Sequence, residues 1–527
     1  MAEMKRIDRR QKVRHGFHQA KWDEPVIFEL SVPGERGVLV PKADQKIRAE
    51  VGDMENLLPA SLLRKNPPAL PEISQPRVLR HYMRLSQETL GADFNVEIGQ
   101  GTCTMKYSPK INDQLSRLPQ MAELHPLQDE STVQGILHIL HETDRCLCEI
   151  SGMSRFSFQP GSGSQAALLM ASLVRAYFTS KGEDAQRTEV ITTQYSHPSD
   201  AAAPHVAGYE IIHIPPDKDG YPDWDAFQAA VSEKTAAFLV ANPEDTGIYN
   251  SRVQDFTRLV HEKGGLCCYD QANVNGLLGI TRAKEAGFDM CYFNLHKSFS
   301  APHGCGGPAC GATGVVPFLV PFLPGPIIQE SDGKYHLTES ESPYAVGKVR
   351  SYQGAAQVVL KAYAWIRALG AEGLYQVAKT AVLNNNYLYK KLLELPEVSV
   401  PYIPEQQRVE QCRYSLETLY NETGVDTVDV QRRIMDFGMH YWQSHHPWYV
   451  PQPMTLEPTE TPSKADIDEY IETLKTIFAE AHTDPETVKT APHRSVCAQL
   501  DESNMDDPDK WAITWRSYLR KYRPAEE

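Results

Sequence analysis

The chain has 527 residues and a formal net charge of -15 at neutral pH. This acidic balance argues against a nucleic-acid-binding protein, because such proteins concentrate positive charge on one face. Hydrophobic residues make up 41% of the sequence, which is enough to build the large buried core of an enzyme.

Residues 1–100 are expected to form an N-terminal arm with some helix. Prolines interrupt its middle from Pro59 to Pro71, and a helical pattern is confined to 76–87. The basic segment 1–12 is not followed by an apolar run, so we expect no signal peptide. Ten cysteines in such a chain then indicate reduced thiols and a cytoplasmic location.

From about residue 131 the pattern becomes regular. Ser131 is expected to cap a helix that runs through Ile150, and the turn 161–164 is expected to open a second helix over 165–177. Short apolar runs then predict strands, with helical stretches between several of them: 189–193, 209–214, 236–241, 266–269 and 289–293. Buried strands that alternate with helices indicate a mostly parallel sheet in an α/β domain. We place this large domain at 101–360.

Past the large domain, the sequence predicts a smaller one and a tail. Prolines break the apolar tract 314–328, so it cannot be a transmembrane helix, and no membrane association is expected. Helical patterns over 354–369 and 371–393 lead into a small α/β domain, whose bounds we place at 361–490. In the tail, 491–527, apolar side chains four residues apart predict an amphipathic helix, which packs on the core or on another subunit: Trp511, Trp515 and Leu519.

Three successive predicted strands end in residues suited to one cofactor. Lys297 follows the last strand and precedes a glycine-rich turn, where partial desolvation makes its amine nucleophilic enough for a Schiff base with an aldehyde. Asp270 closes the preceding strand and can pair with a pyridinium nitrogen. Asn242 closes the strand before that, and its amide can donate to a phenolate oxygen. The series predicts pyridoxal 5'-phosphate, although a strand-end aspartate is often a helix cap.

Other residues fit the same cofactor. The turn Gly161–Ser164 begins a helix, so its N–H groups and hydroxyls favour a phosphate, with a plain N-cap as the alternative. His197 can stack on the ring or be an ordinary loop histidine, and His296 is assigned to the cofactor with its neighbour Lys297. The cysteines lack the paired spacing of structural zinc sites, so no metal is expected.

Several long and unusual motifs are spread along the chain from Ile27 to Pro492: IFELSVPG (27–34), RHYMRLSQ (80–87), GTCTMKY (101–107), ELHPLQ (123–128), NLHKSFS (294–300), GKVR (347–350) and LEPTET (456–461). With these motifs the chain resembles the pyridoxal-phosphate glycine dehydrogenase (decarboxylating), the P-protein of the glycine cleavage system. More narrowly, it is similar to subunit 2 of the split bacterial form and matches the C-terminal half of the single-chain enzyme.

The resemblance implies a fold and a set of site residues. The fold is that of fold-type I pyridoxal-phosphate enzymes, similar to aspartate aminotransferase. Lys297 is implied as the Schiff-base lysine, Asp270 as the partner of the pyridinium nitrogen and His197 as the stacking residue. The family's phosphate loop falls on Ser162, Gly163 and Ser164. The family's active-site loop falls on residues that we assign to the substrate together with Asp200: Cys103, Thr104 and Lys106, with Tyr107 beside them.

The resemblance also implies a reaction and partners. Glycine is decarboxylated, and the remaining aminomethyl group passes to the lipoyl arm of an H-protein. A partner similar to subunit 1 is expected, and the assembly is a homodimer or a heterotetramer.

The likeness is weakest at positions that would face the substrate. Asp200 stands where the family has an amide, Glu244 and Asp245 add two acids to a neutral run, and Arg413 replaces part of a His-Glu pair. The segment 439–448 is unusually rich in histidine and aromatic residues. Two alternatives therefore stay open: a pyridoxal-phosphate decarboxylase or lyase acting on another amino acid or amine, and a non-catalytic assembly subunit.

Overall fold

The computed structural model describes residues 13–52, 57–66, 68–91, 94, 98–99, 106–303, 306–440, 449–501, 503 and 505–523. The chain divides into two compact units. The larger unit comprises Gly91–Ala491 with the residues up to Gly16, and the smaller unit comprises Phe17–Leu90 with Pro492–Glu527.

A seven-stranded sheet forms the centre of the larger unit, in the order β1-β7-β6-β5-β4-β2-β3. The strands from β3 to β6 are parallel, whereas β7 runs antiparallel to β6 and β1 antiparallel to β7. Their bounds are β1 Arg155–Ser157, β2 Glu189–Thr193, β3 Glu210–Ile214, β4 Thr235–Ala241, β5 Leu266–Gln271, β6 Met290–Asn294 and β7 Gly311–Val315. The mostly parallel α/β architecture and all five predicted strands are confirmed to within two residues at each end.

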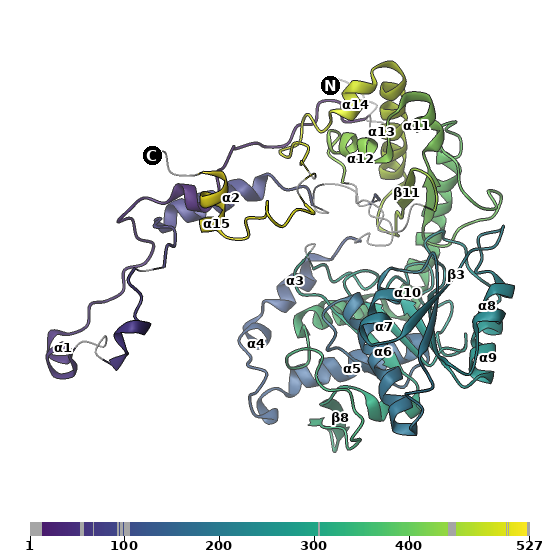
Figure 1. Cartoon of the computed structure of the whole chain (residues 1–527), viewed down its shortest axis with the longest axis horizontal. Helices are drawn as coiled ribbons and strands as arrows, with labels where there is room; N and C mark the ends of the chain where they lie inside the picture. The colour runs from purple at the N-terminus through teal and green to yellow at the C-terminus, as the bar shows by residue number, and fades with distance from the viewer. Residues whose placement is uncertain are drawn as a thin grey trace, which may run out of the picture. The chain divides into compact units, whose positions relative to one another are not determined.

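Helices cover this sheet, as parallel strands require (Figure 1). Helix α6 packs across β4 to β7, and α9 packs on β4 and β5. The covering helices are α5 (Gln134–Ser151), α6 (Gly163–Lys181), α7 (Ser199–Val206), α8 (Trp224–Ala230) and α9 (Val253–Glu262). Shorter helices, α3 (Lys110–Ser116) and α4 (Pro119–Ala122), precede them.

The predicted start of α5 was wrong. Ser131 does not cap that helix but lies in a 3-10 turn, η5 (Glu130–Thr132), whose own cap is Asp129. The Asp129 carboxylate accepts hydrogen bonds from both the Ser131 N–H (3.0 Å) and the Ser131 hydroxyl (2.5 Å). A carboxylate is a stronger hydrogen-bond acceptor than a hydroxyl, so Asp129 rather than Ser131 is the capping residue.

The proline-rich tract 314–328 contributes no long helix. It forms the end of β7, a 3-10 helix η6 (Pro317–Phe322) and the start of the hairpin β8 (Ile327–Ser331) and β9 (Lys334–Thr338). None of the helices in the described part of the chain combines the length and the apolar character that a membrane span requires.

A second hydrophobic cluster lies on the C-terminal side of the larger unit. It begins in α10 (Ala356–Leu392), a helical stretch that is broken at Gly370 (φ 64°), the position that separates the two predicted helices. The other elements are α11 (Glu417–Thr423), α12 (Thr427–Met435), α13 (Lys464–Thr483), α14 (Pro485–Lys489) and the antiparallel pair β10 (Cys412–Ser415) and β11 (Pro453–Leu456). The two clusters belong to one compact unit, and the predicted division into domains at 360 and 361 stays a prediction.

The smaller unit joins the two ends of the chain. Its elements are η1 (Ile27–Leu30), α1 (Gln45–Val51), η3 (Ala60–Leu62), α2 (Gln75–Gln87) and α15 (Trp515–Tyr522). The predicted tail helix is present as α15, and its Trp515 stacks on Phe28 of η1 with ring centroids 5.4 Å apart. Arg523 pairs with Glu29 at 2.7 Å. The tail therefore packs on the N-terminal arm of its own chain.

Candidate functional site

The carboxyl ends of β2, β4, β5 and β6 meet at one edge of the sheet, and the predicted site residues gather there. Register places Ala241 of β4 opposite Asp270 of β5, and Asp270 opposite Tyr292 of β6. Lys297 follows β6 by three residues and is 8% exposed. A strand-end lysine thus lies buried beside a strand-end carboxylate.

Two adjoining cavities open at this edge, and both are lined by Lys297, His197 and Ala272. The first extends from Asp270 toward the C-terminal side of the unit, over Tyr195, Asn273, Asp245, Glu410 and Gln411. The second extends toward the start of α6, over Gly163, Ser164, Ser199, Tyr292, Asn294, His296 and His303. Lys297 therefore stands between a pocket that faces the phosphate turn and a pocket lined by acids.

The predicted phosphate turn begins α6, which starts at Gly163 rather than at residue 165. Ser162 is the N-cap, and its hydroxyl accepts from the Gln165 N–H at 3.1 Å. A Cβ on Gly163 would lie 2.7 Å from the amide nitrogen of Asn294, so only glycine lets the turn approach the end of β6 this closely. Gly163 and Ser164 at the helix N-terminus line the cavity that holds Lys297, an arrangement suited to an anion, whereas the cap Ser162 lines neither cavity.

Arg350 is a phosphate-site candidate that the strand-end reasoning missed. Its guanidinium occupies the space where a Cβ on Gly161 would stand. Gln165 fixes the two segments to each other, because its side chain accepts from the Gly161 N–H (2.6 Å) and donates to the Val349 carbonyl (2.8 Å). Arg350 belongs to the GKVR motif, so the motif was the signal that could have found it.

The buried polar atoms of this cavity fit a polar ligand. Within the described residues, His296 Nδ1, Asn294 Oδ1 and His303 Nδ1 are buried without a hydrogen-bond partner. Burial, with Lys297 and His303 nearby, lowers the pKa of His296 to about 3, so its ring is neutral at physiological pH. Buried polar atoms in native proteins are normally paired. A lysine amine, an anion site and buried polar atoms without partners in one cavity fit pyridoxal 5'-phosphate.

The environment of Asp270 differs from the prediction in one residue. Asp270 Oδ1 accepts from the Ala272 N–H at 2.8 Å, and its carboxyl lines the first cavity. Asp200 was assigned to the substrate, but it is fully buried, lines neither cavity and lies close to Asp270. It belongs to the first turn of α7.

Asn242 also differs from its predicted role. Its amide donates to the Asn250 carbonyl (3.2 Å) and accepts from the Asn250 N–H (2.8 Å), and it lines neither cavity beside Lys297. The side chain closes the loop after β4 instead of pointing at a ring. Asn273, unlike Asn242, lines the first cavity with Lys297. The Asn273 amide donates a hydrogen bond to the Glu457 carboxylate at 2.8 Å.

Two of the departures from the family pattern meet in the structure. Asp245 forms an ion pair with Arg413 of β10, and the side chains are 2% and 0% exposed. Glu410 lies in the same cavity, and burial, with Glu457 nearby, raises its pKa to about 8. Burial likewise raises the pKa of Glu457 to about 7. This cavity therefore holds one matched ion pair and carboxyls that tend to keep their protons.

The active-site loop is described only in part. Cys103 and Thr104 lie outside the described residues. Lys106 is buried, pairs with Glu460 at 3.0 Å and sits over the Trp365 ring at 4.7 Å. Burial lowers its pKa, against the opposing effect of Glu460. It lines neither cavity, so the structure ties it to the C-terminal elements.

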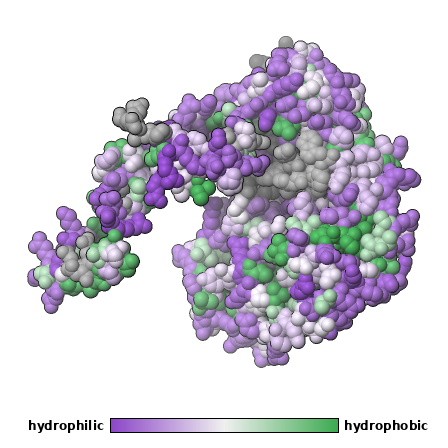
Figure 2. Space-filling model, in the orientation of Figure 1, coloured by the Kyte–Doolittle hydropathy of each residue, from purple (hydrophilic) through white to green (hydrophobic). Residues whose placement is uncertain are grey.

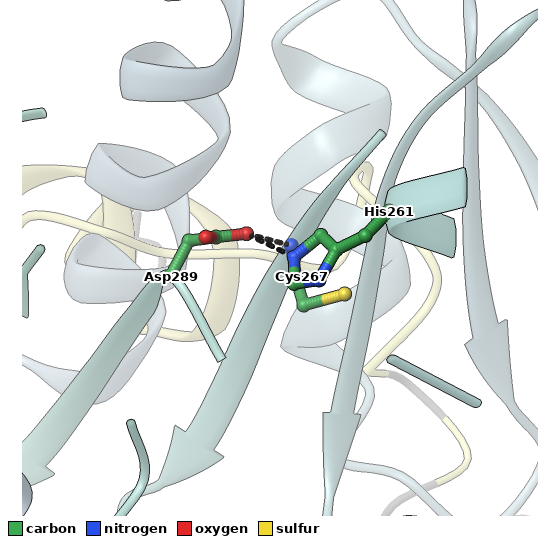
Figure 3. Close-up of side chains that lie close together, drawn as sticks. All are labelled: His261, Cys267 and Asp289. Atoms are coloured by element: carbon green, nitrogen blue, oxygen red, sulfur yellow. Dashed lines mark hydrogen bonds and ion pairs between the residues drawn. The ribbon is translucent and has the colours of Figure 1, made fainter. Parts of the chain in front are cut away.

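One group in the described part of the chain could offer three metal ligands: His261, Cys267 and Asp289 (Figure 3). Asp289 Oδ2 accepts from both His261 Nε2 (2.8 Å) and the Cys267 N–H (2.8 Å). The Cys267 thiol donates instead to the Thr257 carbonyl at 3.6 Å. The Asp289 carboxylate therefore links α9 to β5 and β6, at the edge of the sheet opposite Lys297.

Comparison with known proteins first defines the class. The aminotransferase class-V family model matches residues 153–435. A crystal structure of the glycine decarboxylase P-protein superposes with a TM-score of 0.69 at 22% identity, covering 84% of this chain and 100% of that one. The cysteine desulfurase of Thermococcus onnurineus gives 0.56 at 17%, covering 74% and 98%. The chain has the fold of pyridoxal-phosphate enzymes of this class, as predicted, and the predicted cofactor is that of the class.

Curated relatives then define the family. A probable glycine dehydrogenase (decarboxylating) subunit 2 from Pyrococcus horikoshii is 40% identical over 504 residues, which cover 95% of this chain and 98% of the relative. The corresponding protein of Caldanaerobacter subterraneus is 40% identical over 478 residues, covering 90% and 96%. A model of the glycine dehydrogenase C-terminal domain matches residues 377–496. The chain belongs to the glycine dehydrogenase (decarboxylating) subunit 2 family.

Proposed function

We propose that this chain decarboxylates glycine with pyridoxal 5'-phosphate and passes the aminomethyl group to the lipoyl arm of an H-protein. The observation that carries the proposal is the position of Lys297, buried between the Asp270 carboxylate and the start of α6. Family membership supports glycine as the substrate.

In this proposal each residue acts at a stated part of the cofactor. Lys297 would hold the aldehyde of the cofactor through its amine. Gly163 and Ser164 at the helix N-terminus, with Arg350, hold the phosphate. Asp270 keeps a proton on the ring nitrogen, and His197 lies against the ring. When bound, the cofactor withdraws electrons from the bond that breaks at the substrate's α-carbon.

The acid-lined cavity supports a second candidate. Arg413 already pairs with Asp245, so its charge is matched before a substrate carboxylate arrives. Glu410 in the same cavity favours a cationic or neutral group over an anion once it ionises. A decarboxylase or lyase for a different amino acid or amine would exploit these features, which the family's usual residues do not supply.

An exchange assay separates the two candidates. With a subunit 1 partner and H-protein, the purified chain should exchange labelled bicarbonate into the carboxylate of glycine. Exchange should be lost in K297R and retained in K379R, an exposed lysine of α10. Borohydride reduction and peptide mapping should locate the cofactor on Lys297. A reduced adduct on Lys297 without exchange would leave the cofactor assignment and remove glycine, and an amine screen by absorbance would follow.

A partner subunit and a cytoplasmic location complete the proposal. The relatives' name, subunit 2, supports a subunit 1 partner. Exposed apolar side chains on the smaller unit support a protein contact there, and Figure 2 shows hydrophobic residues at the surface around α1. Examples are Val38, Leu39, Val40, Leu62 and Leu70. Native mass measurement after co-expression should give a heteromeric assembly; a homodimer alone would contradict this part.

A further inference from the structure

Asp270 does not stand alone at the end of β5. Asp200, in the first turn of α7, lies close to it: the Ser196 hydroxyl that donates to Asp200 also accepts from the N–H of Ala241, and Ala241 pairs with Asp270 in the sheet. Asp200 has no exposed surface, and Asp270 is 6% exposed. Two carboxyl groups therefore meet at a site shielded from water.

The hydrogen bonds around Asp200 account for one of its oxygens. Oδ2 accepts from the Ser196 hydroxyl at 2.6 Å, and that hydroxyl accepts from the Ala241 N–H at 3.0 Å. Oδ1 is buried and makes no hydrogen bond among the described residues, although the His197 N–H lies near the carboxyl. An oxygen without a donor, next to another carboxylate, is the arrangement expected when that oxygen carries a proton and donates it.

Electrostatics point the same way. Two buried carboxylates in contact cannot both ionise without a large cost. Burial first, and Asp270 second, raise the pKa of Asp200 well above its usual range. Asp270 is the member of the pair that lines the cavity beside Lys297, so it is the one that faces a positive partner.

The other titratable groups near the pair come from three neighbouring segments. Tyr292 of β6 lies near Asp270 and Ser199, and Cys268 of β5 lies near Asp200. His197, before α7, and Lys297, after β6, face the pair's cavity side. Of these, Lys297 stands on the Asp270 side.

We propose that Asp200 is a positioning residue that stays protonated and donates a hydrogen bond to Asp270, so that the two acids share a single negative charge directed at the ring nitrogen of the cofactor. This inference rests on the proposed function for the presence of the cofactor. It also accounts for the departure from the family pattern, because a neutral carboxylic acid and an amide both supply a donor at this position.

The first test needs neither cofactor nor substrate. Infrared difference spectra of the cofactor-free protein between neutral and alkaline pH should show a protonated-carboxyl band that shifts in D₂O. Glu410 and Glu457, whose pKa values are also raised by burial, contribute to this band, so the band of Asp200 is the component that D200N lacks. That component should be present in D255N, in which a partly exposed carboxyl is changed. If wild type and D200N have the same band, or if the wild type has none, the proposal is overturned.

The second test uses cofactor affinity and the conservative variant. D200N keeps a donor, so its dissociation constant for pyridoxal 5'-phosphate should stay within about threefold of wild type. D200A removes the donor and should weaken binding about tenfold or more. If D200N binds pyridoxal 5'-phosphate as weakly as D200A does, a charged Asp200 is needed and the proposal is wrong. Should D200A not fold, D200N and the infrared band decide alone.

These outcomes are separable from a failure of the proposed function. If glycine exchange fails but the band and the D200N affinity are as expected, the substrate assignment is wrong and the carboxyl pair stands. If the band is absent while exchange proceeds, the pair is wrong and the function stands.

Discussion

The Asp245–Arg413 pair offers the sharpest test of the packing between the sheet and β10. Replacing Arg413 with methionine removes the guanidinium and leaves Asp245, 2% exposed, without its counter-charge. Opposite charges about 4 Å apart attract by about 4 kcal/mol at an effective dielectric constant of about 20. Desolvation opposes this attraction in the wild type, yet losing one partner of a buried pair typically costs about 3–5 kcal/mol. We therefore expect R413M to lower the free energy of unfolding by about that amount.

A double-mutant cycle isolates the interaction. D245N/R413M removes both charges, so it should recover about 2 kcal/mol or more relative to the sum of the two single variants. Urea denaturation of the cofactor-free protein, followed by tryptophan fluorescence and far-ultraviolet circular dichroism, measures each free energy. R432M is the matched control, because Arg432 is partly exposed and lies 4.0 Å from Asp429, and it should cost less than about 1 kcal/mol. Equal losses in R413M and R432M, or strictly additive single variants, would refute the reasoning.

Three further predictions concern other residues. The hydrogen bond that the His261 ring donates to Asp289 raises the pKa of His261. The stabilisation is full below about pH 6.5 and is lost as pH rises through the raised value. H261Q should therefore lower the melting temperature at pH 5.5 and converge on wild type at alkaline pH, and a pH-independent gap would contradict this. The pKa of Glu410 is raised to about 8, so the folded state keeps a proton that the unfolded state loses, and wild-type stability falls as pH rises from about 4.5 toward 8. E410Q should match the melting temperature of wild type best at pH 5 and melt higher than wild type at pH 8. Parallel pH profiles of the two proteins would refute this prediction. G163A should weaken cofactor binding about tenfold in a fluorescence titration, because its Cβ would clash with the Asn294 amide. G135A is the control, because a Cβ there meets open space, and it should bind the cofactor as wild type does. Equal affinities of G163A and G135A would refute the argument from close approach.

Much of the fold could be predicted because its signals are local. The strand at 189–193 was predicted with the bounds that β2 has, and the break between the two long helices falls at Gly370, whose backbone is left-handed. The outer strands β1 and β7 were missed. β1 has three residues and β7 is glycine-rich, so neither carries a pattern without the pairing of Phe156 with Gly314 across the sheet.

The site was predictable wherever a strand end fixes a side chain. Parallel strands deliver their carboxyl ends to one edge, which is why Asp270 and Lys297 came together. Asn242 is equally close to a strand end, but the loop it closes took its amide. Asp245 and Arg413 were each visible as departures from the family pattern. Their meeting depends on how β10 folds back onto the sheet, which no local pattern encodes.

The smaller unit has a consequence for how this protein is made. Trp515, which stacks on Phe28, is synthesised after it, and Gly91–Ala491 of the larger unit lies between them in the sequence. The stacking of α15 on η1 can therefore form only after that part of the larger unit has been translated.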